Sequence, residues 1–218
     1  MGRRDRRRNH QRHPVGILVN ADPALRRATY ADLEAVPPHL VAEIIDGRLE
    51  THPRPRARHG GAANRLGYEL TGPFDRGRDG PGGWIFIPEP ELRLGSDVVV
   101  PDLAGWRRER MPTEPETAYI ETPPDWICEI LSPSTSRLDR GPKRRIYAAS
   151  GISYLWLLDP TERQLECFAL AGGQWLLQAT FQPGDEVRVA PFDAIGFPLD
   201  ALFPFDAPAS QEKPSEEA

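Results

Sequence analysis

The stretch that decides the fold is "DWICEILSPSTSRLDRGPKRRIYAASGISYLWLLDP", residues 125–160. It opens with a short apolar run typical of a buried strand, which carries one carboxylate, Glu129, and breaks at a Ser-Pro step. Asp139 is expected to cap a helix that holds Pro142 in its first turn and ends at Gly151. The apolar run 153–160 and "QLECFAL" then predict a hairpin that turns at residues 159–163.

The rest of the chain alternates between the same two kinds of element. Thr29 and Asp32 predict the cap of a short helix over residues 30–35, and Asp46-Gly47 predicts a hairpin turn. "ARHGGAANRLGYEL" (57–70) has helical spacing, whereas "WIFIPEPELRL" (84–94), "DVVVPDLAGW" (97–106) and "GQWLLQATFQ" (173–182) are typical of strands. This order predicts an α/β (α+β) fold with a central mixed β-sheet flanked by helices.

The ends of the chain differ from its middle. The chain has 218 residues and 39% hydrophobic residues, enough for one sizeable core. We expect a basic, disordered arm over residues 1–20, one domain over 21–206 and an acidic, disordered tail over 207–218. Without the arm's net charge of +5, the net charge of −5 becomes about −10. A globally basic nucleic-acid binder is therefore excluded, and a polyanion would be held locally or through metal ions.

The two cysteines and the lengths of the apolar runs indicate the compartment. Cys128 and Cys167 both lie in apolar, strand-like runs, where buried free thiols are expected rather than a disulfide. No apolar run approaches the roughly 18 residues that a membrane span needs. The sequence therefore predicts a cytoplasmic protein without a membrane partner.

Three carboxylates fall among apolar side chains: Glu43, Asp102 and Glu129. Strand alternation puts each on a face with apolar neighbours, namely Val41 and Ile45, then Val98, Val100 and Ala104, then Ile127 and Leu131. A buried, unpartnered carboxylate costs several kcal/mol, so a compensating charge is expected. Mg²⁺ is the natural candidate. The alternative for each acid taken alone is an edge position, a turn or a salt bridge.

A basic helix turn follows Glu129. Lys143 and Tyr147 are four residues apart and share one helical face, so Lys143 is expected to point toward the end of the Glu129 strand. The alternative is that the "KRR" run at 143–145 is simply a solvated turn.

Three segments carry a resemblance to a known family: "EIIDGRLE" (43–50), "VVVPDLAGW" (98–106) and residues 127–160. In that order and spacing they resemble the Uma family of bacterial restriction endonucleases, a branch of the PD-(D/E)XK nuclease superfamily. The resemblance extends from about Tyr30 to Phe203. It implies a restriction-endonuclease-like core that cuts DNA with Mg²⁺, for which Mn²⁺ can substitute.

The resemblance also implies roles for individual residues. Glu43, Asp102 and Glu129 match the acids of the superfamily, and Asp102, Glu129 and the carbonyl of Ile130 would hold the metal. The superfamily lysine is replaced here by Leu131, so the resemblance implies Lys143 as the catalytic lysine. The supporting residues would be Tyr147 and His59, the latter with the alternative of a capping or packing histidine.

Two other functions stay open from the sequence. One is a catalytically weak or inactive module that binds nucleic acid or a protein partner through the same fold. The other is an unrelated metal hydrolase, or a structural domain whose acids are salt-bridged. A homodimer is also a possible assembly, with "SYLWLL" (153–158) as its predicted interface.

Overall fold

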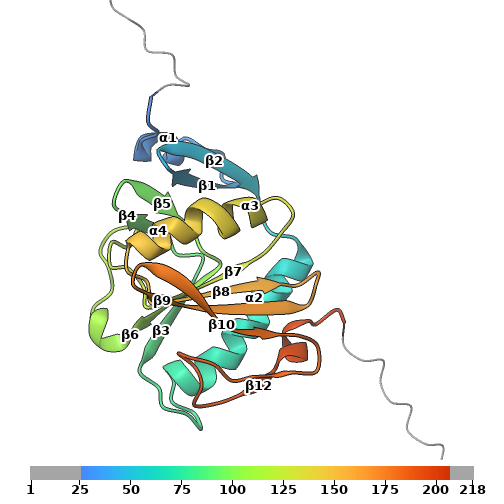
Figure 1. The fold of residues 1–218 in the computed structure, drawn as a ribbon. Coiled ribbons are helices and arrows are strands. Elements are labelled where there is room, and N and C mark those ends of the chain that lie inside the picture. The colour runs from blue at the N-terminus through green and yellow to red at the C-terminus, as the bar shows by residue number, and fades with distance from the viewer. Residues whose placement is uncertain (1–25, 207–218) are drawn as a thin grey trace, which may run out of the picture.

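A computed structural model describes residues 26–206 (Figure 1). Its helices are α1 (Tyr30–Glu34), α2 (Ala57–Leu70), α3 (Ser136–Leu138) and α4 (Arg144–Ala149), with π-helical turns at Thr71–Asp75 and Asp139–Lys143. Its strands are β1 (Leu40–Ile45), β2 (Arg48–Pro53), β3 (Trp84–Pro88), β4 (Leu92–Leu94), β5 (Asp97–Val99), β6 (Leu103–Arg107), β7 (Trp126–Ile130), β8 (Tyr154–Asp159), β9 (Gln164–Ala171), β10 (Gln174–Phe181), β11 (Glu186–Val187) and β12 (Phe197–Pro198). The predicted arm (1–20) and tail (207–218) lie outside the described residues.

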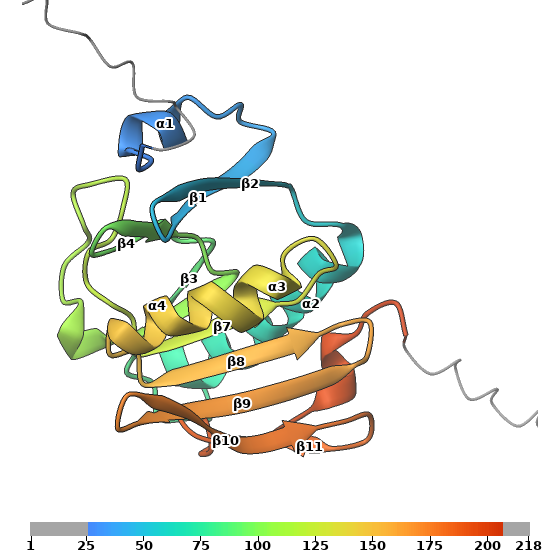
Figure 2. The same cartoon turned by 45° about the horizontal axis from the view of Figure 1, so that its top comes forward.

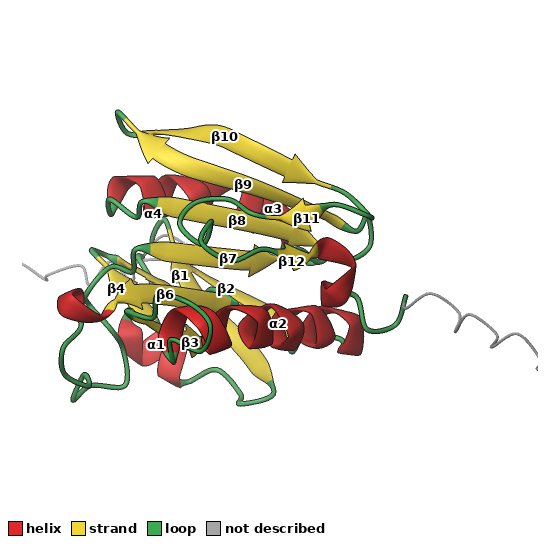
Figure 3. Ribbon diagram, turned by 90° about the horizontal axis from the view of Figure 1, so that it is seen from below, coloured by secondary structure: helices red, strands yellow, loops and turns green. Residues whose placement is uncertain are grey.

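The strands form a large mixed sheet and a smaller antiparallel one. The six-stranded sheet has the order β10-β9-β8-β7-β6-β3, in which β7 and β8 run parallel and the other neighbours run antiparallel (Figure 3). The four-stranded sheet has the order β2-β1-β5-β4, and β11 pairs with β12. The predicted mixed sheet flanked by helices is confirmed.

Helices cover both faces of the six-stranded sheet. Helix α2 buries Leu66 and Leu70 on one face, where they join Trp126 and Cys128 of β7. Helix α4 lies between the two sheets, and its Tyr147 packs within the second apolar cluster (Figure 2). All five residues of β7 are buried. A near-continuous apolar strand is what a position covered on both faces requires.

Several local predictions are confirmed. Asp46 and Gly47 have φ of 53° and 76°, as the tight turn between β1 and β2 requires. The Asp32 carboxylate accepts a hydrogen bond from the backbone N–H of Thr29 (2.8 Å) at the start of α1. Gly151, just beyond α4, has φ of 72°, and a residue with a Cβ would be strained there.

Two predicted strands are wrong as continuous elements. The run 84–94 divides into β3 and β4, and the run 97–106 divides into β5 and β6, one strand of each in each sheet. Pro101 has no N–H to continue a ladder, and Glu89 turns the chain with φ of 45°. Asp102 therefore lies in the connection between the sheets, and the predicted face that it shares with Val98, Val100 and Ala104 does not exist.

The predicted start of the second helix is also wrong. The helical run begins at Ser136 rather than after Asp139 and continues through the π-helical turn Asp139–Lys143 into α4. Asp139 is buried inside the run and is no cap, and Pro142 lies inside the π-helical turn. A missing Pro N–H breaks the regular ladder, and a π-helical turn is one way for a helix to accommodate such a break.

The interior position of β8 corrects a further expectation. This strand lies between β7 and β9, and its residues 155–158 are buried. It has no free surface for a dimer interface, so the assignment of "SYLWLL" is wrong, while dimerisation itself stays a prediction. Cys128 and Cys167 are buried free thiols, as predicted. Within residues 26–206, no helix is both long enough and apolar enough to span a bilayer.

Candidate active site

A buried lysine lies among three carboxylates at the junction of the two sheets. The Lys143 Nζ atom is 2.8 Å from Glu129 Oε1, 3.0 Å from Glu43 Oε1 and 3.4 Å from Asp139 Oδ1. All four side chains are at most 3% exposed. We call this group, with Tyr147, the carboxylate cluster.

Each member of the cluster comes from a different part of the fold. Glu43 lies on β1 of the four-stranded sheet, and Glu129 lies on β7 at the centre of the six-stranded sheet. Asp139 and Lys143 are the first and last residues of the π-helical turn, which directs both into the space between the sheets. The expected proximity of Lys143 and Glu129 is confirmed.

Hydrogen bonds fix the two glutamates. The hydroxyl of Tyr147 donates to Glu129 Oε1. The backbone N–H of Val100 donates to Glu43 Oε1 over 2.8 Å, and His52 Nε2 lies 3.3 Å from Glu43 Oε2. Each carboxylate is thus held by at least two groups, which fixes its orientation.

Burial and the central ammonium group set the charges of the cluster. Burial raises the pKa of Glu129 well above its ordinary value, against the opposing effect of Lys143. Burial would also raise the pKa of Glu43, but Lys143, His52 and the N–H of Val100 lower it to about 2. Burial alone lowers the pKa of Lys143, yet Glu129 and Glu43 raise it well above its ordinary value. Lys143 is therefore a buried cation at neutral pH.

Asp102 lies beside the cluster at the end of β7. The pairing of Leu103 with Cys128 places Asp102 opposite Glu129 on the neighbouring strand. Asp102 Oδ2 accepts a hydrogen bond of 2.6 Å from the backbone N–H of Ile130. Its other oxygen, Oδ1, is 3.2 Å from Nε2 of His59, near the start of α2. Burial lowers the pKa of His59, but Asp102 and the Ile130 backbone raise it, and the net change is a rise.

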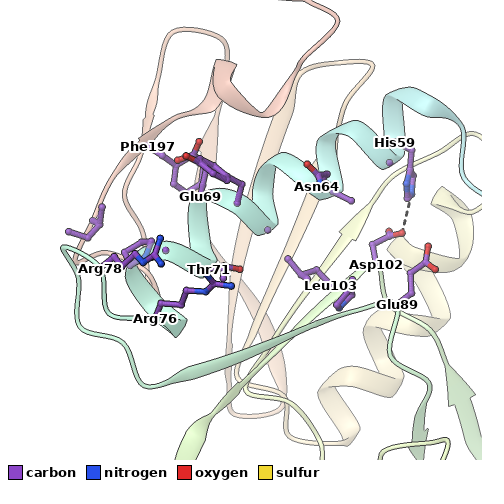
Figure 4. A pocket seen from close by; sticks show the side chains of 18 of the residues that line it. His59, Asn64, Glu69, Thr71, Arg76, Arg78, Glu89, Asp102, Leu103 and Phe197 are labelled. Carbon is purple, nitrogen blue, oxygen red and sulfur yellow. Dashed lines mark ion pairs between the residues drawn. The ribbon is translucent and has the colours of Figure 1, made fainter.

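A cavity of about 1090 Å³ opens beside this pair (Figure 4). Asp102 and His59 line one end of it, and the figure shows their side chains directed toward each other. Glu43, Glu129 and Lys143 are not among its lining residues. A substrate in the cavity would therefore meet Asp102 and His59 first, with the carboxylate cluster behind them.

The comparison with protein families decides what this arrangement belongs to. The model of the Uma2 family, described as "Putative restriction endonuclease", matches residues 27–201. The chain belongs to the Uma2 family. A crystal structure of a "putative nuclease belonging to DUF820" from Anabaena variabilis is similar in fold, with a TM-score of 0.62 and 22% identity over 75% of this chain and 89% of that one. No curated protein matches the sequence.

The donors at the end of β7 suit a divalent cation of the hard type in this Uma2 protein. The carboxylates of Asp102 and Glu129 and the carbonyl of Ile130 are all oxygen donors. Within residues 26–206, no three His, Cys, Asp or Glu side chains are grouped as ligands of one metal. Mg²⁺ commonly uses only one or two carboxylates and keeps several waters, so the available donors are sufficient for it.

Two members of the site were not identified from the sequence. Asp139 was interpreted as a helix cap, although its spacing of four residues from Lys143 is the signal of a helical ion pair. His52 carried no sequence signal, because its contact with Glu43 depends on the register between β1 and β2. Each sequence-predicted acid also has a cationic neighbour in the protein, Lys143 or His59, in keeping with the salt-bridged alternative.

Proposed function

We propose that this Uma2 protein is a Mg²⁺-dependent endodeoxyribonuclease that hydrolyses phosphodiester bonds within DNA. The observation that carries the proposal is the position of Asp102, Glu129 and the Ile130 peptide at one strand end, beside an open cavity. Family membership supports the same class of reaction. Open sheets commonly place their sites at such strand ends.

Asp102, Glu129 and the Ile130 carbonyl would hold the metal ion. Mg²⁺ bound there would polarise a phosphoryl oxygen and lower the pKa of a bound water. The protein's own groups fix the geometry, because the Ile130 N–H holds one Asp102 oxygen and Tyr147 holds Glu129. Preorganised groups of this kind need no rearrangement when charge develops.

Lys143 supplies the positive charge that the superfamily lysine would supply from the strand. Leu131, at that strand position, is buried in the apolar cluster between the sheets. The ammonium group instead arrives from the π-helical turn and lies 2.8 Å from Glu129. In this role Lys143 would orient the attacking water or stabilise charge on the phosphoryl oxygens, and Glu43 would hold Lys143 in place.

A second candidate function is a nucleic-acid or protein binding module with little or no catalysis. The observation that favours it is that Lys143 already neutralises Glu43 and Glu129 without a metal. Such a cluster would be stable as a purely structural element.

The test is DNA cleavage by the full-length protein. Supercoiled, linear double-stranded and single-stranded DNA are incubated with Mg²⁺, Mn²⁺ or EDTA. We expect metal-dependent nicking of the supercoiled circle, and a loss of about 100-fold or more in Asp102→Asn. The matched control is Asp193→Asn, an exposed aspartate away from the site, which should cleave like the wild type. Absence of cleavage of every substrate, or equal cleavage by Asp102→Asn, would favour the binding module.

A further inference from the structure

The cavity beside Asp102 continues along helix α2 as a groove. Its helical wall is built from small or polar residues, including Gly60, Asn64, Gly67 and Thr71. A Cβ added at Gly60 or Gly67 would meet no atom within 4 Å, so the helix backbone is open to close approach there. An extended ligand could therefore lie against this wall.

Two arginines line the far end of the groove. Arg76 and Arg78 are exposed, and Figure 4 shows both at the end opposite His59 and Asp102. The carboxylate next to Arg76 in sequence, Asp75, is paired with Arg108 over 2.6 Å. Within the part of the chain that the structure describes, neither Arg76 nor Arg78 forms an ion pair. Both guanidinium groups are available to an anionic ligand, and phosphate is the anion that suits their geometry.

The length of the groove sets a distance between the two ends. Helix α2 passes directly into the π-helical turn that ends at Asp75, so the backbone from His59 to Arg76 is helical almost throughout. At about 1.5 Å per residue this segment is roughly 25 Å long. One strand of a DNA duplex advances about 3.4 Å per nucleotide, so the span corresponds to roughly seven nucleotides.

We propose that this groove holds one strand of duplex DNA and that Arg76 and Arg78 bind a backbone phosphate roughly seven nucleotides from the scissile one. The inference rests on the proposed function, because Asp102 defines where the scissile phosphate lies. Phosphate contacts of this kind fix the register of a protein on DNA and carry no sequence information. The two arginines are positioning residues for the substrate.

Two carboxylates oppose this binding. Glu69 and Asp79 also line the groove, whereas Glu89, at the Asp102 end, is 3.5 Å from Arg54. Their negative charge weakens attraction to the DNA backbone. Removing the charge of Glu69 should therefore tighten binding, which is the opposite of the effect of removing Arg76 or Arg78.

The first experiment measures DNA binding without cleavage. Fluorescence anisotropy of a labelled duplex is recorded in Ca²⁺ over a range of salt concentrations. We expect Arg76→Gln/Arg78→Gln to bind more weakly, with a salt slope smaller by roughly 1 per arginine, and Glu69→Gln to bind more tightly. Arg65→Gln is the matched control, because Arg65 is an exposed arginine of α2 that does not line the groove. It should bind like the wild type.

The second experiment tests the distance. Duplexes are shortened stepwise on one side of the cleavage point, and KM is measured for the wild type and the double variant. The double variant should raise KM on long duplexes and have no effect once fewer than about seven nucleotides remain on that side. Wild-type protein that cleaves DNA but shows the same binding and KM in both forms would overturn the groove inference. So would wild-type protein that does not bind DNA.

Failure of the two proposals is distinguishable. If the wild type binds DNA through Arg76 and Arg78 but never cleaves it, the nuclease proposal fails and the groove stands. If it cleaves DNA and the double variant behaves like Arg65→Gln, the groove inference fails and the nuclease stands.

Discussion

Lys143 is the single positive charge in a space that contains three buried carboxylates. A charge removed from water is tolerated only when opposite charges and hydrogen bonds replace its hydration. Glu43, Glu129 and Asp139 provide the charges, at 2.8–3.4 Å from the ammonium nitrogen. The same arrangement leaves those carboxylates dependent on Lys143.

The stability of Lys143 variants tests this dependence. Lys143→Met should lower the free energy of unfolding by about 3–5 kcal/mol, because three carboxylates remain buried without a cation. Adding Glu129→Gln should recover part of the loss, since it removes one of the unpaired charges. Urea denaturation of the two single variants and the double variant measures the coupling. Strictly additive effects would show that Lys143 and Glu129 are not energetically linked.

At the level of elements, the sequence predicts the kinds of helix and strand better than their membership. The hairpin at Asp46-Gly47 and helix α2 follow from local chemistry and periodicity, which a single sequence contains. The division of 97–106 between two sheets does not, because β5 and β6 have the same strand-like composition. Pro101 was the available sign of that break.

The candidate site follows the same division. The approach of Lys143 to Glu129 was predicted, because a strand end and a helix face are both visible in the sequence. The contact between Asp102 and His59 was not, because it joins a connection between sheets to the start of α2. Asp139 was misread as a cap, since the π-helical turn that buries it leaves no periodic signal.

For the whole molecule, the carboxylate cluster links the two sheets. Glu43 belongs to the smaller sheet, Glu129 to the larger one, and Lys143 bridges them from the helical turn. The stability of the joined sheets should therefore depend on the ionisation of Glu43.

This dependence gives a pH prediction. The pKa of Glu43 is about 2 in the folded protein, below the ordinary value of about 4.3 for an unfolded chain. A lowered folded pKa stabilises the protein above the unfolded value, here by about 3 kcal/mol, and the effect is lost as pH falls toward 2. The difference in unfolding free energy between the wild type and Glu43→Gln should thus be constant above about pH 5 and shrink below it. Urea titrations from pH 7 to pH 3 measure it, and a difference that does not change with pH would contradict the assignment.

The central claim is that the end of β7 binds a divalent metal ion. Its most direct test is a crystal of the protein soaked in Mn²⁺ and measured at the manganese absorption edge. We predict an anomalous peak within about 2.2 Å of an Asp102 oxygen and the Ile130 carbonyl, absent from Asp102→Asn crystals. No peak at this position, at a Mn²⁺ concentration that supports DNA cleavage, would contradict the account.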